Sequence, residues 1–573
     1  MHAALRSRIL TGISLCALIL LNACGGGGGG GGGGAPVTPV TPVTPQADVF
    51  NWTGNTRLTV AASPTTGLLA NDPPGTVITA ADTLSTQGGA VNVVLASGAF
   101  TYDPPVGLQN VADTFTYTTS GALPTTVTVN LAERIWYIDN SLQINGDGTF
   151  GNPFNNLAAA EAPIISDDND TIFVFTGVPA APTDDGQDLG ITLVTGQKLL
   201  GQGLVLRVNG VQVAPLRPNP PVISNAGLAA GGDIPVVLLA TGNEVAGFTI
   251  QADFNEGILA LGGAGHNLHD NDFIFDAANG REGIRLLNVT GENFVTVNTI
   301  PGSPRDGIKL ANNEDQAGTA VAATPIVASV TMSRNTITGS AQDGIAVILA
   351  GTNTAVNLNI LTNTITNSGA SEGIDIDSLD AASVIAVVSR NTISGSAQEA
   401  VNQTAASTSG MNAFVANNDL SASGVAADFS AAIVNPAAFC LELINNFNAV
   451  GDTAFLINNG GVDGAFRFFE VDNDIAAGTV GLITPVAQGT CSIPLDGAAL
   501  FVANCAKCHT GNGLGLTTVK QLIGPDITNA TPEAINLQLG INGSMILDFS
   551  PTGRLRLTQQ EITAIAAALV LAP

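Results

Sequence analysis

The sequence is poor in charged and aromatic residues. Of its 573 residues, 11% are charged and 5% are aromatic, while 45% are hydrophobic; average domains carry about 25% charged residues. The shortage of Lys and Glu excludes a long coiled coil, and the wealth of apolar residues excludes a disordered chain. Only 18 basic residues stand against 46 acidic ones. Because a nucleic-acid-binding protein needs a cationic face, nucleic acid is excluded as a partner.

What the chain has in quantity is glycine, 67 residues in all, together with many Thr, Asn and Val. These residues favour short strands separated by turns over long helices. The composition therefore predicts a mainly β protein. At roughly 150 residues per domain, its length predicts three or four folded units.

The N-terminus has the pattern of an export signal. Two arginines precede an apolar run at residues 9–21, which is too short to span a bilayer. The run ends in Leu21-Asn22-Ala23-Cys24, which resembles the lipobox of bacterial lipoproteins. The resemblance implies that residues 1–23 are removed, that Cys24 is lipidated, and that the chain is anchored to outer-membrane lipid in the cell envelope. The alternative is an ordinary secretory signal with an incidental cysteine.

Residues 24–46 form a linker. Ten consecutive glycines at 25–34 predict a flexible coil, and three copies of Pro-Val-Thr at 36–44 favour a stiff extended conformation. We expect this segment to hold the folded part away from the lipid.

Residues 47–132 show the alternation of a small antiparallel sandwich. Phe100 and Tyr102 lie two residues apart, as do Phe115 and Tyr117, and Pro, Gly and Asp separate the runs. These motifs resemble the immunoglobulin- or cadherin-like modules of bacterial surface proteins, which implies a spacer. An acidic loop at Asp72 is a weaker candidate for calcium binding.

Residues 133–493 contain an internal repeat. Arg-Asn-Thr-Ile-Thr at 334–338 recurs in related form at 362–366 and 390–394, in steps of 28 residues. A fixed period of this length indicates a solenoid, and the short strands between turns favour a right-handed parallel β-helix. We expect the isoleucines to stack inward and the asparagines to adopt the left-handed turn conformation, with their amides bonding between coils. Weaker copies of the motif place three more asparagines in this role: Asn271, Asn298 and Asn418.

A second marker of each repeat is an acidic residue followed by Gly-Ile. A longer step of 37 residues between Asn298 and Asn335 predicts a loop insertion at 312–323. A solvated turn is the simplest role for these acids. The marker begins at Glu256, Glu282, Asp306, Asp343 and Glu372.

The start of the repeat region is similar to the first coils of pectate-lyase-like β-helix proteins. The similarity lies in residues 135–139, 146–149, 152–154 and 170–174. It implies the fold and leaves the function open, because this fold hosts lyases, hydrolases, adhesins and inert stalks.

Evidence for enzymatic chemistry in the repeat region is weak. Sugar-processing members of this fold use carboxylates along a cleft floored by aromatic rings, yet no Trp or Tyr follows Tyr137. Asp375 and Asp377 share a strand face beside Glu372 and are the carboxylates to test first. His266 and His269 are expected on opposite faces of a strand, where they would be poor metal co-ligands and have structural roles.

Four cysteines remain after the two of the signal peptide. Cys440 and Cys491 lie 51 residues apart, about two coils, and an exported chain permits a disulfide between them. The alternative is two buried thiols. The other two cysteines form Cys505-Ala506-Lys507-Cys508-His509, the CxxCH pattern of covalent c-type haem attachment. A zinc site is disfavoured because no Cys or His follows His509, and a thioredoxin-like motif lacks its βαβ setting.

The order of motifs around CxxCH resembles a small class I cytochrome c spanning 494–573. An amphipathic segment at 496–501 leads into the motif. Gly524-Pro525, Met545 and a capping box at 558–561 follow in that order. The resemblance implies one covalent haem c attached through Cys505 and Cys508, with His509 and Met545 as iron ligands. It further implies that the carbonyl of Pro525 orients the His509 ring. Two positions depart from the pattern: Ile546 stands where proline is usual, and Ala568 where an aromatic residue is usual.

The sequence therefore predicts an exported lipoprotein that displays a monohaem cytochrome on a β-helix stalk. Its expected function is one-electron transfer at the cell envelope, and its acidic charge favours a basic redox partner. Two alternatives remain. One is a surface adhesin or binding stalk in which haem is secondary, and the other is a β-helix polysaccharide lyase or hydrolase.

Overall fold

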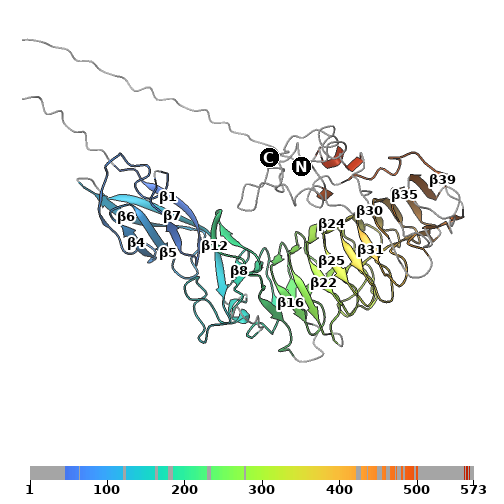
Figure 1. Ribbon diagram of the computed structural model, residues 1–573, viewed down its shortest axis with the longest axis horizontal. Coiled ribbons are helices and arrows are strands. Elements are labelled where there is room, and N and C mark those ends of the chain that lie inside the picture. The colour runs from blue at the N-terminus through green and yellow to red at the C-terminus, as the bar shows by residue number, and fades with distance from the viewer. Residues whose placement is uncertain are drawn as a thin grey trace, which may run out of the picture.

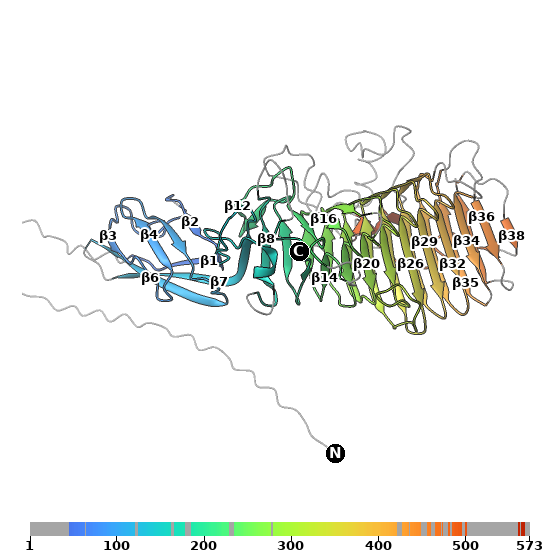
Figure 2. The ribbon, with the colours of Figure 1, turned by 90° about the horizontal axis from the view of Figure 1, so that it is seen from below.

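The computed structural model shows a small β-sandwich that leads into a long parallel β-helix (Figures 1 and 2). The predicted mainly β architecture is confirmed. The signal peptide, the linker to residue 44 and residues 501–559 lie outside the described part of the chain. The structure describes residues 45–500 and 560–567, apart from 64, 121–123, 162–165, 178–184, 229–233, 277–278, 421–426, 435, 448–454, 460–464, 472, 474–478, 482–483, 496–498, 562 and 566.

The sandwich has two sheets that enclose the aromatic residues predicted from the alternation. Phe100, Tyr102, Phe115 and Tyr117 are all buried. One sheet has the strand order β3-β6-β7, with β1 pairing in parallel with β7, and the other has the order β2-β5-β4. The strands are β1 (Asp48–Gly54), β2 (Leu58–Val60), β3 (Ile78–Ala81), β4 (Ala90–Val94), β5 (Ala99–Asp103), β6 (Val111–Thr119) and β7 (Thr125–Ile138).

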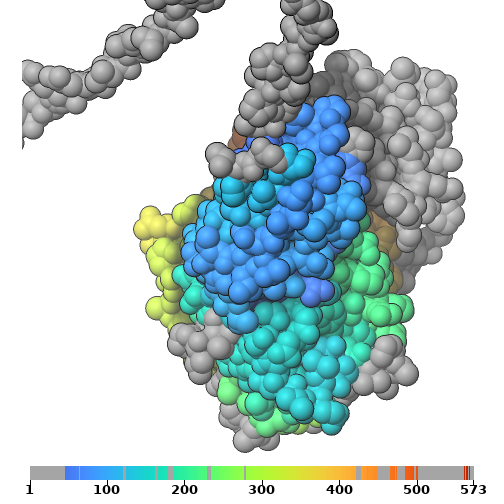
Figure 3. All heavy atoms as spheres, turned by 90° about the vertical axis from the view of Figure 1, so that its left-hand side faces the viewer, coloured from blue at the N-terminus to red at the C-terminus, as the bar shows by residue number. Residues whose placement is uncertain are grey.

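Strand β7 belongs to both the sandwich and the solenoid. Its first half pairs antiparallel with β6, and residues 135–138 pair in parallel with β8 (Thr171–Val174). Residue 132, the expected boundary, lies inside this strand. Tyr137 from the first coil packs in the sandwich core, where its hydroxyl lies 2.6 Å from the Thr56 hydroxyl. The two parts therefore share a sheet and an apolar core, and the sandwich lies over the first coils when viewed along the long axis (Figure 3).

Three parallel sheets form the walls of the solenoid, and each coil contributes about one strand to each wall. We call them the long sheet, which continues from β7, the eleven-stranded sheet and the seven-stranded sheet. The long sheet contains β8, β10 (Lys198–Gly201), β15 (Glu244–Ala246), β18 (Asn267–His269), β21 (Gly291–Thr296), β24 (Val327–Ser333), β27 (Ala355–Leu361), β30 (Ser383–Ser389), β33 (Gly410–Ala416), β35 (Ala438–Ile444), β37 (Phe466–Val471) and β39 (Thr484–Pro485).

The other two walls follow the same progression along the chain. The eleven-stranded sheet contains β9 (Ile191–Thr192), β14 (Val237–Leu239), β17 (Ile258–Ala260), β20 (Ile284–Leu287), β23 (Ile308–Ala311), β26 (Ile345–Ala350), β29 (Ile374–Leu379), β32 (Val401–Ala405), β34 (Phe429–Ile433), β36 (Phe455–Asn459) and β38 (Thr479–Gly481). The seven-stranded sheet contains β13 (Val222–Ser224), β16 (Thr249–Ala252), β19 (Asp272–Phe275), β22 (Thr299–Pro301), β25 (Thr336–Thr338), β28 (Thr364–Thr366) and β31 (Thr392–Ser394). A hairpin of β11 (Leu206–Val208) and β12 (Val211–Ala214) and a 3-10 helix η1 (Leu157–Ala160) interrupt the early coils.

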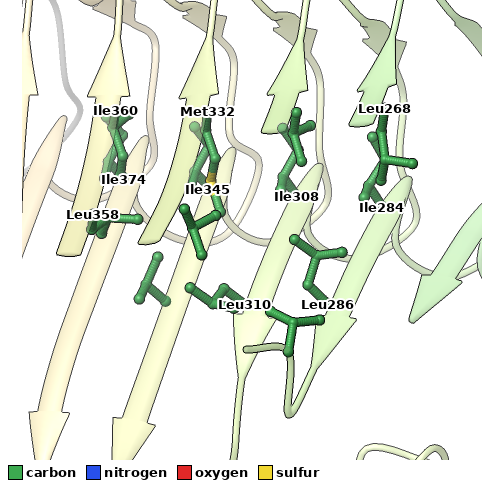
Figure 4. Close-up of a cluster of buried hydrophobic side chains, with 14 of the residues drawn as sticks. Leu268, Ile284, Leu286, Ile308, Leu310, Met332, Ile345, Leu358, Ile360 and Ile374 are labelled. Atoms are coloured by element: carbon green, nitrogen blue, oxygen red, sulfur yellow. The ribbon is translucent and has the colours of Figure 1, made fainter. Parts of the chain in front are cut away.

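The predicted isoleucine stacks form the core. Ile308, Ile345 and Ile374 are in register on neighbouring strands of the eleven-stranded sheet and are fully buried. Figure 4 shows them facing the long-sheet residues Met332 and Ile360 across the interior. Burying each such side chain contributes about 1.5–3 kcal/mol, so the repeat itself carries most of the apolar stabilisation.

The predicted asparagine ladder is also present, but the left-handed residue precedes each asparagine. Positive φ values belong to Arg334 at 55°, Thr362 at 55° and Arg390 at 57°. The side-chain oxygen of each asparagine accepts a hydrogen bond from the backbone N–H of the asparagine one coil earlier. This bond closes the turn. Each amide donates to the side-chain oxygen of the next along the series Asn271, Asn298, Asn335, Asn363, Asn391, Asn418, Asn446 and Asn473.

A disulfide joins the last coils, as the cysteine spacing predicts. The Cα atoms of Cys440 and Cys491 lie 5.4 Å apart, and the bridge closes a separation of 51 residues. The Cys491 backbone N–H also donates to Glu442 Oε1 at 3.2 Å. Within the described residues, none of the helices has the length and apolar character needed to cross a bilayer.

Candidate functional sites on the solenoid

The acidic residues of the repeat marker stack along one edge of the eleven-stranded sheet. Each lies two residues before the first residue of its strand, so parallel pairing places them one coil apart. The prediction of solvated turns is wrong for the first three: Glu256, Glu282 and Asp306 are at most 1% exposed. We call the set the acidic ladder, and it comprises Glu256, Glu282, Asp306, Asp343, Glu372 and Glu399.

Basic side chains neutralise the first half of the acidic ladder. Arg285 on β20 is fully buried, and its guanidinium donates to Glu256 Oε1 at 3.0 Å and to Glu314 Oε2 at 2.9 Å. Lys309 on β23 lies 2.9 Å from Glu314 Oε1 and 3.6 Å from Asp306 Oδ2. Since buried charges require partners, these contacts explain how the acids are accommodated.

The predicted insertion at 312–323 covers this network. The Arg285 guanidinium donates to the backbone carbonyl oxygens of Asp315 at 2.9 Å and Gln316 at 2.7 Å, and Arg281 donates to the latter at 3.0 Å. One buried arginine therefore joins the acidic ladder to the inserted loop. Sequence reasoning missed Arg285, although an arginine inside a strand is a signal in a chain with so few cations.

The second half of the acidic ladder has a different environment. Asp375 and Asp377 point outward from β29 beside Glu372, as the sequence predicts, and Asn402 on β32 donates to Asp375 Oδ1 at 2.8 Å. Among the described residues, no Lys, Arg or His forms an ion pair with these acids or with Asp343. They form a group of half-buried carboxyls without cationic partners.

Burial and mutual repulsion raise the pKa values of Asp343, Asp375 and Asp377. Burial raises the pKa of Asp375 to about 8, with the charges of Asp377 and Asp343 adding to the effect. Burial likewise raises the pKa of Asp343 to about 7, and that of Asp377 is raised by the same cause. A protonated carboxyl close to an ionised one is the pair that general acid–base chemistry uses.

A buried aliphatic cluster lies beside the carboxyl group, outside the solenoid core. Leu259, Leu287 and Ala311 form a buried cluster on the outer face of the eleven-stranded sheet, with Leu238 and Ile348 packed against them. These side chains are aliphatic, so the cluster contributes no ring face on which a sugar could stack.

The two histidines occupy separate environments, as predicted. His266 is fully buried, and its Nε2 lies 3.1 Å from the Gly262 carbonyl oxygen. His269 lies between Asp270, at 2.8 Å, and Glu244, at 3.1 Å. Burial alone would lower the pKa of His269, but hydrogen bonds with these two carboxylates outweigh it and raise the pKa to about 9. His269 is therefore an imidazolium that satisfies two acids.

Two further predictions concern ions. At the acidic loop of the sandwich, Asp72 accepts the Tyr117 hydroxyl at 3.0 Å and the Gln46 backbone N–H at 2.7 Å. Over the ranges that the structure describes, no three His, Cys, Asp or Glu residues are grouped as metal ligands. The residues predicted to bind haem, Cys505, Cys508, His509, Pro525 and Met545, lie outside these ranges, as does Cys24, the predicted lipidation site.

Comparison with known proteins gives little information. No protein-family model matches the chain, and no curated protein matches it. A solved structure of a family 28 exopolygalacturonase from Yersinia enterocolitica is similar to it at 13% sequence identity and a TM-score of 0.29. The match covers 68% of this chain and 86% of that one. The fold described above rests on the strand pairing and not on this likeness.

Proposed function

We propose that the protein is an envelope-anchored c-type cytochrome that transfers single electrons and displays its haem domain on the β-helix. The observation that carries the proposal is the sequence Cys505-Ala506-Lys507-Cys508-His509 in an exported chain. The two cysteines would attach one haem c covalently. His509 and Met545 would hold its iron, and the Pro525 carbonyl would orient the His509 ring. When bound, haem c supplies a one-electron carrier.

Two features support this proposal, one from the structure and one from the sequence. A disulfide between Cys440 and Cys491 fits an oxidising compartment outside the cytoplasm, where c-type haem is attached. The chain's net charge is −28, yet from residue 491 onward it has four basic and five acidic residues. A basic redox partner would therefore be attracted by the acidic solenoid towards a nearly neutral haem domain.

The test is covalent haem on the full exported chain. We would co-express it with a c-type maturation system, then record an intact mass and a haem-stained denaturing gel. The proposal predicts one haem per chain, which the double variant Cys505→Ser/Cys508→Ser loses. The matched control, Cys440→Ser/Cys491→Ser, removes the other cysteine pair and should keep its haem. Parent protein that is folded and exported but carries no haem would overturn the proposal.

The lipid anchor has its own test. Cys24→Ser should move the protein from the membrane fraction to the soluble fraction of the envelope, because only the lipid would hold it there. Metabolic labelling with a fatty-acid analogue would show the loss of the acyl group directly. A parent protein that takes up no label would contradict lipidation.

The unpaired carboxyls on β29 favour a second candidate function, hydrolysis or cleavage of an anionic glycan. The supporting observation is the raised pKa of Asp375 beside Asp377. Reducing-end or unsaturated-product release from anionic polysaccharides would be measured for the parent, Asp375→Asn and Asp377→Asn. Asp272→Asn, at an exposed position on β19, is the control. Activity that both β29 variants lose and the control keeps would support this candidate, and no activity in the parent would remove it.

A further inference from the structure

The outer face of the long sheet changes character along the solenoid. Phe294 on β21 and Phe414 on β33 lie in the same row of outward-facing residues, yet they are 39% and 1% exposed. From β27 onward, a set of outward-facing apolar residues towards the carboxyl ends of the strands is covered. We call these residues the docking face, and they are Leu361, Val387, Phe414, Ala416 and Ile444.

Both ends of the C-terminal region cover the docking face. Ala499 and Leu500 at its beginning are 5% and 1% exposed, and Ile565 near its end is fully buried; all three pack in the same apolar cluster. Ile493 and Leu495 pack against the cluster from the connecting segment. The short helical stretches that carry Leu500 and Ile565 lie beside β30 (Figure 1).

A buried ion pair stands within this contact. Arg390 Nη1 donates to Glu561 Oε1 at 2.6 Å, and Arg390 Nη2 donates to Glu561 Oε2 at 2.7 Å. The Ser389 hydroxyl donates to Oε1 of the same carboxylate at 2.7 Å. The two charged side chains are 1% and 0% exposed. A bidentate pair of this kind fixes orientation as well as position, and neither charge is tolerated there without the other.

We propose that the docking face holds the whole C-terminal region, residues 494–573, as a bound domain. Leu500 and Glu561 contact the solenoid from the two sides of residues 501–559 in the sequence, so the chain is tethered to the docking face at both points. The cationic side of the contact is Arg390 on the solenoid, and its acidic complement is Glu561. These contacts support docking whether or not haem is present. The presence of haem in the bound domain rests on the proposed function. Docking would then fix the orientation of the haem relative to the solenoid.

The experiment separates the two parts of the full mature chain. A protease recognition sequence is inserted between Ser492 and Ile493, after the disulfide, so that cleavage leaves no covalent link between solenoid and C-terminal region. Circular dichroism before cleavage checks that the inserted chain is folded. Docking predicts that the fragments still co-elute on size exclusion at 0.15 M and at about 1 M salt, because the contact is largely apolar and its ion pair is screened little. Fragments that separate at both salt concentrations would overturn the proposal.

Variants at the contact make the test specific. Glu561→Gln should speed dissociation about 100-fold or more, because it leaves Arg390 buried without a countercharge. The double variant Arg390→Met/Glu561→Met should recover much of the retention. Phe294→Asp lies in the uncovered part of the same row and is the matched control. It should leave the dissociation rate of the fragments unchanged. Retention unchanged by Glu561→Gln would contradict the role of the pair.

The readouts distinguish the two proposals. An intact mass of the C-terminal fragment reports haem whether or not the fragment stays bound. A retained fragment without haem would support docking and contradict the cytochrome proposal. A released fragment with haem would contradict docking and support the cytochrome proposal.

Discussion

The side-chain amide of Asn363 donates to Oδ1 of Asn391 at 3.0 Å, and the Asn363 backbone N–H donates to the same oxygen at 2.9 Å. The second amide proton of Asn363 reaches the Met332 carbonyl oxygen at 2.9 Å. One side chain thus satisfies groups in the coil before its own and in the coil after it. Because it is buried, none of these bonds can be replaced by solvent.

Replacing one asparagine of the ladder should therefore be costly. Asn363→Ala leaves the Met332 carbonyl without this donor and removes the acceptor of Asn335. We expect a loss of about 2–3 kcal/mol in the free energy of unfolding, measured by denaturant titration. Asn357→Ala, at an exposed position on β27, should change stability by less than about 0.5 kcal/mol. Equal effects of the two substitutions would contradict the role of the ladder.

The unpaired carboxyls predict a stability that falls with pH. The folded-state pKa of Asp375 is about 8, above the ordinary value of 3.8, so the folded protein binds this proton more tightly than the unfolded chain does. The contribution of this carboxyl to the free energy of unfolding is fully present below about pH 4. It is lost as the pH rises through about 8. The asparagine of Asp375→Asn keeps an oxygen that can accept the hydrogen bond from the Asn402 amide. Its side chain cannot ionise. We expect it to match the parent at pH 4 and to exceed it by about 1–2 kcal/mol at pH 8.5, after allowance for solvent screening.

Thermal unfolding from pH 4 to pH 9 checks this expectation. Asp272→Asn, on an exposed position of β19, should run parallel to the parent across the range. An Asp375→Asn variant that is less stable than the parent at pH 8.5 would show that the carboxylate is stabilised there by a partner.

The charged His269 predicts a second pH effect. Its pKa is about 9 in the folded protein and 6.5 as an ordinary value, so its contribution is present below pH 6.5 and disappears as pH rises through 9. His269→Gln should therefore lower the melting temperature more at pH 6 than at pH 10. His266→Gln is the contrasting control: burial lowers the pKa of His266, so its variant should lose less at pH 5 than at pH 8. Identical pH profiles for the two variants would contradict both assignments.

The sequence predicted the features that repeat and the disulfide, and it missed the ion pairs between distant residues. The 28-residue period specified the isoleucine core and the asparagine ladder, because each coil contributes the same residue to the same stack. The period did not predict that Glu256 is buried, because the burial of Glu256 depends on its pairing with Arg285 and on Glu314 from the inserted loop. The contact of Arg390 with Glu561 spans 171 residues and has no periodic signal. The alternation within β30 and β33 likewise carries no signal that a second layer covers Val387 and Phe414.

Arg285 should be a strong determinant of local stability. Arg285→Met keeps the length of the side chain and removes its charge, which leaves Glu256 and Glu314 without this partner and frees the loop carbonyls. We expect a loss of about 3–5 kcal/mol at neutral pH and faster proteolysis within residues 312–323. Arg57→Met, which removes an exposed pair with Asp103, is the control and should cost less than about 1 kcal/mol. Loop cleavage at the parental rate in Arg285→Met would show that the loop is held by other contacts.

The disulfide closes the end of the solenoid, where no further coil stacks beyond β38 and β39 among the described strands. In the chain-entropy account, a bridge over 51 residues stabilises by about 4 kcal/mol because it restricts the unfolded chain. Cys440→Ala/Cys491→Ala should therefore lower the urea midpoint of the last coils while the sandwich and the first coils, monitored together through Trp52 and Trp136, unfold as before. A reducing agent should reproduce the effect in the parent and have none in the double variant. If reduction left the parental midpoint unchanged, the apolar packing of Phe439 and Phe466 would be what closes the solenoid.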